Sequence, residues 1–369
     1  MSATITVSAL ALQAGVPVLW WGPPGTGKSS QMRALAQALG VPIEVIIASI
    51  REPSDFGGLP AIIDKSVHMV PPLWARNLFA AGQGIAFFDE ISTAAPAVQA
   101  GLLRVILDKV VGDLQLPATI AMAAAANPAE QAAGGWDLAA PLANRFYHDQ
   151  YELSTGEWFD GMLSGFPAPS VPLLKDGWDS IEPLSRASVV SFIRHRPTLK
   201  LQVPDAAADA GKAWPAPRTW TMAARLMAAA SSVGYGQDSD VTMRAVAGCV
   251  GPGPAGELLA YLKELDLQDP EDILAAPEKF KLPTRSDRQF ATLASVAAAV
   301  LSNTTPERWL ACWKVMAKAA KDGPKDVAAA STGSLLRLPS KRPDLPLPVD
   351  EIKVFRPIME KAGYLPKAR

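Results

Sequence analysis

The feature that most constrains this chain is a glycine-rich segment near its start, which matches the pattern G-x-x-x-x-G-K-[ST] in full. The matching residues are Gly22, Pro23, Pro24, Gly25, Thr26, Gly27, Lys28 and Ser29. An apolar run of strand length, residues 17–21, precedes the segment, and a helical pattern, residues 30–39, follows it. Strand, glycine-rich loop and helix form the context that a phosphate-binding loop requires. We expect the loop and the adjacent Ser30 to surround a bound triphosphate, with the helix N-terminus facing the phosphates.

Length and composition set limits on the rest of the chain. With 369 residues, of which 49% are hydrophobic, the chain predicts two or three domains with sizeable cores. The 35 basic and 36 acidic residues give a net charge of −1, so the overall charge argues against a nucleic-acid or anionic-membrane partner. The cysteines, Cys249 and Cys312, lie far apart and predict no disulfide framework, which fits a reducing compartment.

Targeting and membrane segments are not expected. Residues 1–15 are mildly apolar, but they lack a basic start and lead directly into the first strand, so we expect no cleavable signal. The most apolar later stretches, residues 118–126 and 290–301, are shorter than the ~18 residues that a membrane-spanning helix needs. We therefore expect a soluble cytoplasmic protein with no membrane contact.

The first half of the chain alternates strand-like and helix-like segments, which is typical of an α/β domain with a largely parallel sheet. The expected strands are residues 17–21, 42–48, 85–89, 119–125 and 146–153. The expected helices are residues 29–39, 73–81 and 96–107. Because ligands of such sheets bind at the carboxyl ends of the strands, polar residues at those ends are the candidates for a functional site.

Two adjacent carboxylates, Asp89 and Glu90, end the apolar run at residues 85–88. Such a run is typical of a central strand that is buried on both faces. Beside a phosphate-binding loop the pair suits magnesium-assisted hydrolysis: Asp89 would hold Mg²⁺ with the Ser29 hydroxyl, and Glu90 would orient and polarise the attacking water. The alternative is a solvated acidic strand end. The histidines do not cluster in the sequence, so we expect no other metal site.

Two further polar residues flank predicted strands. Asn127 follows the strand at residues 119–125, where its amide would hydrogen-bond the γ-phosphate or the attacking water; the alternative is a turn residue before Pro128. Arg145 precedes the strand at residues 146–153. It would either form a surface salt bridge or reach the γ-phosphate of a neighbouring subunit, where charge builds up in phosphoryl transfer.

The second half of the chain is predicted to be largely helical. Residues 155–184 are rich in Gly, Pro and Trp, which indicates an irregular connector. Helical patterns follow at residues 187–195, 218–232, 241–250, 256–264, 285–301, 307–321 and 351–362. We expect four segments: an α/β core at residues 1–153, a connector at 154–184, a helical domain at 185–265 and a helical extension at 266–369.

Together these motifs resemble the AAA+ ATPases, and most closely their MoxR-like branch, over about residues 5–235. The matches, in the order of the family, are residues 22–29 as Walker A, residues 85–90 as Walker B, Asn127 as sensor 1, Arg145 as the arginine finger and Arg218 as sensor 2. The resemblance implies a P-loop NTPase (AAA+) parallel-sheet sandwich, followed by an all-α lid at residues 185–265 and the helical C-terminal extension.

Details of the sequence relate the chain to the MoxR-like branch and also separate it from that branch. Residues 52–58 are similar to the Ser-Asp-x-x-Gly segment of the branch, and residues 89–103 to its Walker B helix. Ser92 and Thr93 replace the usual Asn-Arg after the acidic pair, which removes a basic residue. The usual acidic residue before Arg145 is also missing, so Arg104 is a substitute candidate for the arginine finger.

The resemblance assigns a role to each candidate residue in ATP hydrolysis. Lys28 would bind the β- and γ-phosphates, while Ser29 and Asp89 hold Mg²⁺ and Glu90 activates water. Asn127 and Arg218 would contact the γ-phosphate in the same subunit, and Arg145 would contact it from the neighbouring subunit.

The resemblance also implies a homo-oligomeric ring, expected to be a hexamer, that remodels or activates a protein client. Proteins of this branch typically act as chaperones for a partner with a von Willebrand factor A domain. Residues 51–74 would supply the loop that faces the pore. Two alternatives stay open: a nucleic-acid motor or clamp-loading subunit, which the neutral charge balance disfavours, and a nucleotide-dependent scaffold that hydrolyses ATP weakly.

Overall fold

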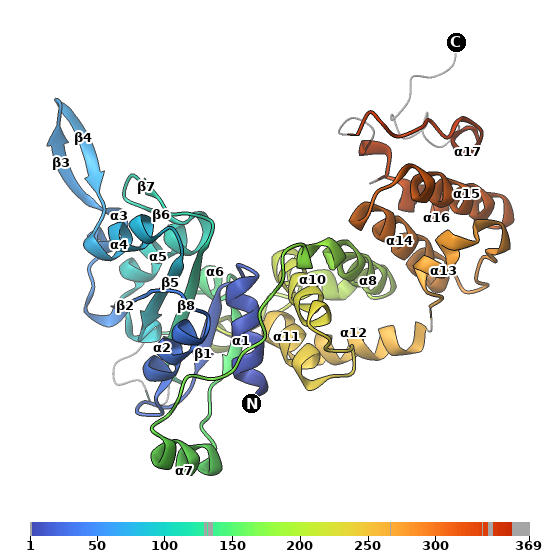
Figure 1. Cartoon of the computed structure of the whole chain (residues 1–369). Helices are drawn as coiled ribbons and strands as arrows, with labels where there is room; N and C mark the ends of the chain where they lie inside the picture. Colours follow the sequence, from blue (N-terminus) through green and yellow to red (C-terminus); the bar gives the residue numbers. More distant parts are fainter. Residues whose placement is uncertain are drawn as a thin grey trace. The chain divides into compact units, whose positions relative to one another are not determined.

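The computed structural model describes residues 2–128, 131, 136–265, 267–333, 335–338 and 342–355 (Figure 1). Contacts within the chain divide it into two compact units. The first unit consists of Met1–Asp176 and Thr198–Glu257, and the second of Gly177–Pro197 and Leu258–Arg369. All of the candidate site residues lie in the first unit.

A five-stranded parallel sheet forms the centre of the first unit, with the strand order β2-β5-β8-β1-β9. The strands are β1 (Val18–Trp21), β2 (Ile43–Ile47), β5 (Gly84–Asp89), β8 (Ile120–Ala126) and β9 (Tyr147–Gln150). They lie where the sequence predicts strands, which confirms the parallel α/β fold. Strands β5 and β8 lie inside the sheet and are buried over nearly their whole length, which explains their continuous apolar sequences.

The register of the sheet brings the carboxyl ends of its strands to one edge. Trp21 at the end of β1 pairs with Ala126 at the end of β8, and Ile47 at the end of β2 pairs with Asp89 at the end of β5. Consequently, the loop after β1, the acidic pair after β5 and Asn127 after β8 all leave the sheet at the same edge.

Three predicted helices of the first unit are confirmed, namely α2 (Lys28–Ala38), α4 (Leu73–Ala81) and α5 (Pro96–Asp108). A cluster of aromatic rings packs between α4, the short helix α3 (Ser54–Gly57) and the sheet. The ring centroids of Trp74 and Phe88 lie 5.9 Å apart, and those of Phe56 and Phe88 lie 6.1 Å apart. This core fixes β5, and therefore the carboxylates at its end.

The N-terminal helix α1 (Ala3–Gln13) was not predicted from the sequence. Residues 4–12 of this helix are all buried, so no polar face interrupts its apolar residues and the usual helical periodicity is missing. A hydrogen bond of 2.8 Å from Trp20 Nε1 to Ser8 Oγ ties the helix to β1. The expectation that residues 1–15 lead directly into the strand was therefore wrong.

Two antiparallel hairpins extend the first unit beyond its sheet. The larger joins β3 (Leu59–Ile63) to β4 (Ser66–Val70), and the smaller joins β6 (Val110–Val111) to β7 (Leu114–Gln115). The larger hairpin projects away from the sheet (Figure 1). Its turn residues, Asp64 and Lys65, both have positive φ, as a two-residue hairpin turn requires. Part of the segment predicted as a loop at residues 51–74 is therefore a β-hairpin.

The first unit is completed by helices, two of them long. These are α6 (Ala140–Ala143), α7 (Thr155–Ser164), α9 (Ala207–Ala210), α10 (Pro217–Ser232) and α11 (Asp240–Val250), with the short 3-10 helices η1 (Ala48–Ile50) and η2 (Ile91–Thr93). Helices α10 and α11 pack against each other and against α1. Helix α7 lies in the region that the sequence predicts to be irregular. Helix α12 (Pro252–Leu265) begins in the first unit and ends in the second.

The second unit is helical, which confirms a helical C-terminal region. Its helices are α8 (Glu182–His195), α13 (Pro270–Ala275), α14 (Ser286–Ser302), α15 (Pro306–Asp322), α16 (Lys325–Thr332) and α17 (Val349–Lys353), with 3-10 turns η4 (Trp178–Ile181), η5 (Pro197–Lys200, which ends in the first unit), η6 (Pro277–Lys279) and η7 (Leu335–Arg337).

Helix α8 packs against α14, although the sequence analysis grouped its residues with the lid. The rings of Trp309 and Trp313 pack in the core of this unit at a centroid distance of 5.7 Å. The predicted helix at residues 351–362 falls largely outside the described residues. No helix in the described part of the chain combines the length and the apolar character that a membrane crossing needs.

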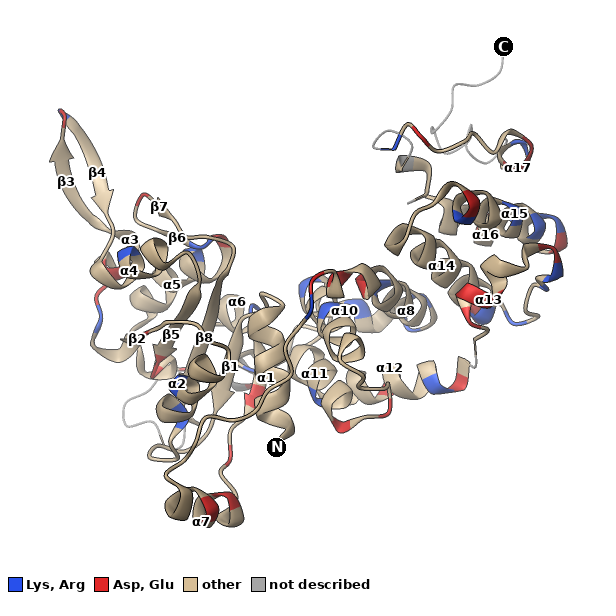
Figure 2. Cartoon of the chain, in the orientation of Figure 1, with Lys and Arg blue, Asp and Glu red and all other residues tan. Residues whose placement is uncertain are grey.

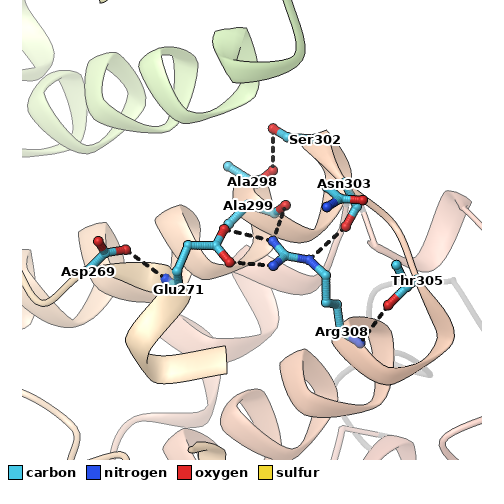
Figure 3. A network of polar contacts seen from close by, with 8 residues as sticks. All are labelled: Asp269, Glu271, Ala298, Ala299, Ser302, Asn303, Thr305 and Arg308. Atoms are coloured by element: carbon cyan, nitrogen blue, oxygen red, sulfur yellow. Dashed lines mark hydrogen bonds and ion pairs between the residues drawn. The ribbon is translucent and has the colours of Figure 1, made fainter. Parts of the chain in front are cut away.

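An arginine joins three helices of the second unit (Figure 3). Arg308 on α15 forms a two-pronged ion pair with Glu271 on α13, in which one hydrogen bond measures 2.8 Å. The same guanidinium donates hydrogen bonds to the backbone oxygens of Ala299 on α14 (2.9 Å) and of Asn303 (2.8 Å). This bonding lowers the pKa of the Glu271 carboxyl below its usual value.

Candidate active site

The loop after β1 has the backbone conformation of a phosphate-binding loop. Gly25 and Gly27 have φ values of 78° and 87°, which side chains other than glycine rarely adopt. A Cβ atom at Gly22 would lie 2.6 Å from the carbonyl oxygen of Tyr151, so glycine is required there for packing. The hydroxyl of Thr26 donates a hydrogen bond of 2.9 Å to the carbonyl of Pro23, which closes the loop.

Lys28 begins α2, and its side chain is buried under the loop. Its ammonium donates hydrogen bonds to the carbonyls of Gly22 (2.7 Å) and Pro23 (2.8 Å) and to Oδ1 of Asn127 (2.9 Å). Burial lowers the pKa of Lys28, while the negative charges of Asp89 and Glu90 raise it. The structure thus brings Lys28 and Asn127 together, from the loop after β1 and the end of β8.

The two residues predicted to hold a metal ion are in contact. The hydroxyl of Ser29 donates a hydrogen bond to Oδ2 of Asp89. The other carboxylate oxygen of Asp89 accepts a hydrogen bond of 3.0 Å from the backbone N–H of Glu90. A hydroxyl and a carboxylate are oxygen ligands of the kind that Mg²⁺ prefers, and Mg²⁺ needs few of them from a protein. These residues therefore fit a magnesium site.

Glu90 is exposed and stands in the left-handed region, with φ 57° and ψ 37°, an uncommon conformation for a residue other than glycine. Its Oε2 accepts a hydrogen bond of 2.5 Å from the hydroxyl of Ser49. Ser49 lies in η1, directly after β2. Sequence reasoning did not identify Ser49, although a polar residue after the predicted strand 42–48 was a signal that could have indicated it.

Ser92 fixes the backbone at Asn127. Its buried hydroxyl donates a hydrogen bond of 3.2 Å to the carbonyl of Asn127 and accepts one of 3.1 Å from the N–H of the same residue. Because the backbone of Asn127 is held by Ser92, its side-chain amide is free to face Lys28. From the sequence Ser92 is only a departure from the family pattern, and this positioning contact was not predicted.

Next to the site, a tryptophan and a histidine are paired between β1 and β9. Trp21 Nε1 donates to Nδ1 of His148 at 3.0 Å, so the other ring nitrogen carries the proton and donates to the carbonyl of Ala143 at 2.8 Å. Burial lowers the pKa of His148 to about 4, which keeps the ring neutral. A cavity of about 540 Å³ lies beside this pair and also reaches Ser92 and Asn127.

Arg145 and Arg218 form a second group. Arg145 is half-buried after α6 and donates a hydrogen bond to the carbonyl of Pro141. Its pKa is lowered by burial and, next in importance, by the positive charge of Arg218, whereas Asp108 raises it. Arg218, at the start of α10, lies in the same part of the first unit, because α6 contacts α9 and Trp214, four positions before Arg218, donates a hydrogen bond of 3.2 Å to the carbonyl of Ala210 on α9. Within the described residues, neither guanidinium forms a hydrogen bond or ion pair with residues 22–30. Arg104 lies exposed on α5.

The fold and these contacts define a class of protein. A parallel sheet with a glycine-rich phosphate-binding loop after β1 and a carboxylate pair after β5 is a P-loop NTPase fold. Residues 18–133 match the model of the family described as "ATPase family associated with various cellular activities (AAA)". This part of the chain is therefore an AAA ATPase domain, as the resemblance indicated. AAA ATPases bind and hydrolyse nucleotide.

Other comparisons add little to this assignment. A solved structure of a candidate ATPase from Cytophaga hutchinsonii is 16% identical and covers 75% of this chain and 88% of that chain, with a TM-score of 0.37. Comparison with curated proteins gave no match.

Proposed function

We propose that this chain is a MoxR-like AAA+ ATPase that assembles as a homo-oligomeric ring, a hexamer, and hydrolyses ATP to remodel or activate a partner protein. One observation carries the proposal: Lys28, Ser29, Asp89, Glu90 and Asn127 gather at the carboxyl edge of the sheet, although they come from separate segments of the chain. This set supplies a cation for phosphates, two oxygen ligands for a metal and a carboxylate for water.

Each of these residues would have a separate role in hydrolysis. Lys28 would bind the β- and γ-phosphates of ATP, and Ser29 with Asp89 would hold Mg²⁺. The bound ion would offset negative charge on the phosphate oxygens. Glu90 would orient the attacking water and accept its proton. Asn127, held by Ser92, would donate its amide N–H to the γ-phosphate or orient the water.

The contact between Ser49 and Glu90 suggests how the resting site is restrained. The Ser49 hydroxyl occupies an oxygen of the carboxylate that would otherwise accept a proton from water. We infer that Glu90 leaves Ser49 when the site is assembled for hydrolysis. Ser49 thereby limits turnover until a neighbouring subunit or a client completes the site.

The proximity of Arg218 to Arg145 supports a revised role for Arg218. The resemblance assigns Arg218 to the γ-phosphate of its own subunit and Arg145 to that of a neighbour. The positive charge of Arg218 contributes to the lowered pKa of Arg145, and α6 beside Arg145 contacts both α5 and α9, so we assign the two guanidinium groups to one surface. We infer that both residues act on the neighbouring subunit's ATP, with Arg145 as the arginine finger and Arg104 as its alternative.

The β3–β4 hairpin is the surface that we assign to the client. Ile62 near its tip is 81% exposed, and Val67 on the facing strand is exposed as well. Exposed apolar side chains on a projecting hairpin favour contact with another polypeptide. This hairpin lies within residues 51–74, which the resemblance assigns to the pore of the ring. The proposal that the client has a von Willebrand factor A domain rests on the resemblance alone.

The proposal is tested by Glu90→Gln, measured for both ATP binding and steady-state phosphate release. We expect the variant to bind ATP as tightly as the wild type and to lose turnover by a factor of about 100 or more. Glu278→Gln, which changes an exposed carboxylate of the second unit, is the matched control and should keep full turnover. Substantial turnover by Glu90→Gln would remove this residue from its assigned role.

The same assay separates the proposal from its two alternatives. Turnover that requires DNA would support a nucleic-acid motor instead. Tight ATP binding by the wild type without turnover would support a scaffold. Proteins captured on the Glu90→Gln variant in the presence of ATP then identify the client, and a captured von Willebrand factor A domain is the expected result.

A further inference from the structure

Helix α7 is a well-formed element whose two ends are fixed by local hydrogen bonds. At its start, the N–H of Glu157 donates to Oγ of Ser154 at 3.2 Å, and the N–H of Ser154 donates to the Glu157 carboxylate at 3.0 Å. At its end, the N–H groups of Gly165 (2.8 Å) and Phe166 (3.0 Å) donate to the carbonyl of Gly161. The ring of Phe166 lies directly over Gly161, where a Cβ atom would be 2.1 Å from the ring.

Although α7 is well formed, its large apolar side chains are uncovered. Leu163 is 89% exposed and Phe159 is 56% exposed, and Trp158 and Met162 are exposed as well. Segments without regular structure join the helix to the rest of the first unit, and the helix stands apart from the sheet (Figure 1). In the part of the chain that the structure describes, no other helix or strand packs broadly against it. A contiguous apolar surface of this kind marks an interaction site.

The charge around α7 narrows the choice of partner. Glu152, Glu157 and Asp160 are exposed, and no Lys or Arg occurs at residues 146–174. Figure 2 shows acidic and no basic residues on α7. The partner surface should therefore be apolar and basic.

This chain carries such a surface elsewhere in its first unit. Helix α6, which directly precedes Arg145, contacts α5, the helix that carries the exposed Arg104 and Leu107. It also contacts α9, and Trp214, four positions before Arg218, donates a hydrogen bond of 3.2 Å to the carbonyl of Ala210 on α9. The contribution of Arg218 to the lowered pKa of Arg145 agrees with this placement.

Residues 201–203 complete this surface. The N–H of Gln202 donates to the carbonyl of Pro215 at 3.0 Å, so the exposed Leu201 and Val203 lie beside the segment that leads into Arg218. We call the group of Arg104, Leu107, Arg145, Leu201, Val203 and Arg218 the arginine face.

The start of α7 is tied to the phosphate-binding loop. The N–H of Tyr151 donates to the carbonyl of Trp21 at 2.7 Å, and the carbonyl of Tyr151 packs against Gly22. Thr155 follows Tyr151 by four positions, a span of roughly 14 Å at most. A subunit docked on α7 is therefore held within reach of the phosphates bound by that loop.

We propose that α7 of each subunit docks on the arginine face of the neighbouring copy and so delivers the neighbour's Arg145 and Arg218 to the ATP site. The inference rests on the proposed ring. The apolar side chains of α7 cover Leu107, Leu201 and Val203, and the carboxylates of α7 pair with the basic rim. The ATP site is then incomplete without the second copy.

A disulfide test locates the contact. Cys249 and Cys312 are both buried, so cysteines introduced at the surface react specifically. In the full-length chain with ATP, Leu163→Cys combined with Leu201→Cys or Val203→Cys should give linked dimers and higher species on mild oxidation. Leu163→Cys combined with Val67→Cys on the hairpin is the matched control and should stay monomeric on a denaturing gel. Absence of linked species with both test pairs, or equal linking in the control, overturns the proposal.

A second variant separates this inference from the proposed function. Phe159→Ser combined with Leu163→Ser should keep its affinity for a fluorescent ATP analogue within twofold, because the nucleotide loop is unchanged. It should no longer assemble in the presence of ATP, as measured by sedimentation. Its ATP turnover should fall at least tenfold. Leu347→Ser combined with Val349→Ser, which changes two exposed apolar residues of the second unit, is the control that should assemble normally. If the wild type assembles and the α7 variant assembles equally well, only the docking is wrong; if the wild type does not assemble with ATP, the proposed ring fails as well.

Discussion

Glu90 is the residue on which hydrolysis depends in the proposed mechanism, and in the structure its carboxylate accepts a hydrogen bond from the Ser49 hydroxyl. We predict that Ser49→Ala raises basal ATP turnover by about three- to tenfold, because an exposed hydrogen bond of this kind contributes on the order of 1 kcal/mol. Steady-state phosphate release at saturating ATP measures the effect. Ser66→Ala, an exposed change on β4, is the control. A fall in turnover would show that Ser49 positions Glu90 for catalysis rather than restraining it.

His148 links the stability of the first unit to pH. Its pKa is about 4 in the folded chain, compared with an ordinary value of 6.5, so between these values the unfolded chain binds a proton that the folded chain does not. The contribution of neutral His148 to the free energy of unfolding is therefore fully present above pH 6.5. As the pH drops towards 4, the free energy of unfolding decreases by roughly 3 kcal/mol. Urea unfolding at pH 7 and pH 4.5 should show that the free energy of unfolding falls more for the wild type than for His148→Gln. Equal losses would contradict the assignment.

At the scale of residues, the convergence of Lys28, Ser29, Asp89 and Asn127 could be predicted because each follows a parallel strand, and the carboxyl ends of such strands share an edge. The contact between Ser49 and Glu90 could not, since it depends on how two short 3-10 segments turn after β2 and β5. The proximity of Arg145 and Arg218 also depends on how α10 packs against α1 and α11, which no local pattern in the sequence encodes.

At the scale of elements, the ion pair between Arg308 and Glu271 joins α13 to α15 (Figure 3). We predict that Arg308→Ala lowers the free energy of unfolding of the second unit by roughly 1–3 kcal/mol, because the ion pair and the bonds to the carbonyls of Ala299 and Asn303 are lost together. Denaturant unfolding of the full chain measures the change. Lys314→Ala, an exposed change on the same helix, should have little effect.

The same pair predicts a dependence on pH. The pKa of Glu271 is lowered by its hydrogen bond with Arg308, so the stabilisation is present above the ordinary value of 4.5 and is lost as the pH falls through the lowered pKa. Since the Glu271 side chain is more than half exposed, the effect is small. This loss of stability at low pH should be absent from Glu271→Gln. If the free energy of unfolding falls equally in both proteins below pH 4.5, the assignment is contradicted.

Elements with clear periodicity were predictable, and those without it were not. Strand β5 and helix α4 follow from their apolar patterns. Helix α1 is buried on every side and so shows no polar stripe, and α7 lies in a Gly- and Pro-containing segment whose apolar residues remain exposed. The β3–β4 hairpin has exposed apolar residues on both strands, and therefore lacks the alternation that a half-buried strand shows.

At the scale of the whole molecule, each ATP site is shared in the account proposed here. The first unit supplies Lys28, Ser29, Asp89, Glu90 and Asn127 from one copy, while Arg145 and Arg218 lie on a separate surface of that copy. Head-to-tail contacts between identical copies, which close into a ring, would bring these two surfaces together. The docking of α7 on the arginine face provides the contact that such an arrangement needs.

The sharing of the site is tested most directly by mixing two inactive variants, Arg145→Ala and Glu90→Gln, and measuring ATP turnover. In a random one-to-one mixture of a head-to-tail ring, about a quarter of the interfaces unite an intact Glu90 with an intact Arg145 from the neighbour. We therefore predict that the mixture regains about a quarter of wild-type turnover, while each variant alone stays inactive. A mixture as inactive as its two components would contradict a site shared between subunits.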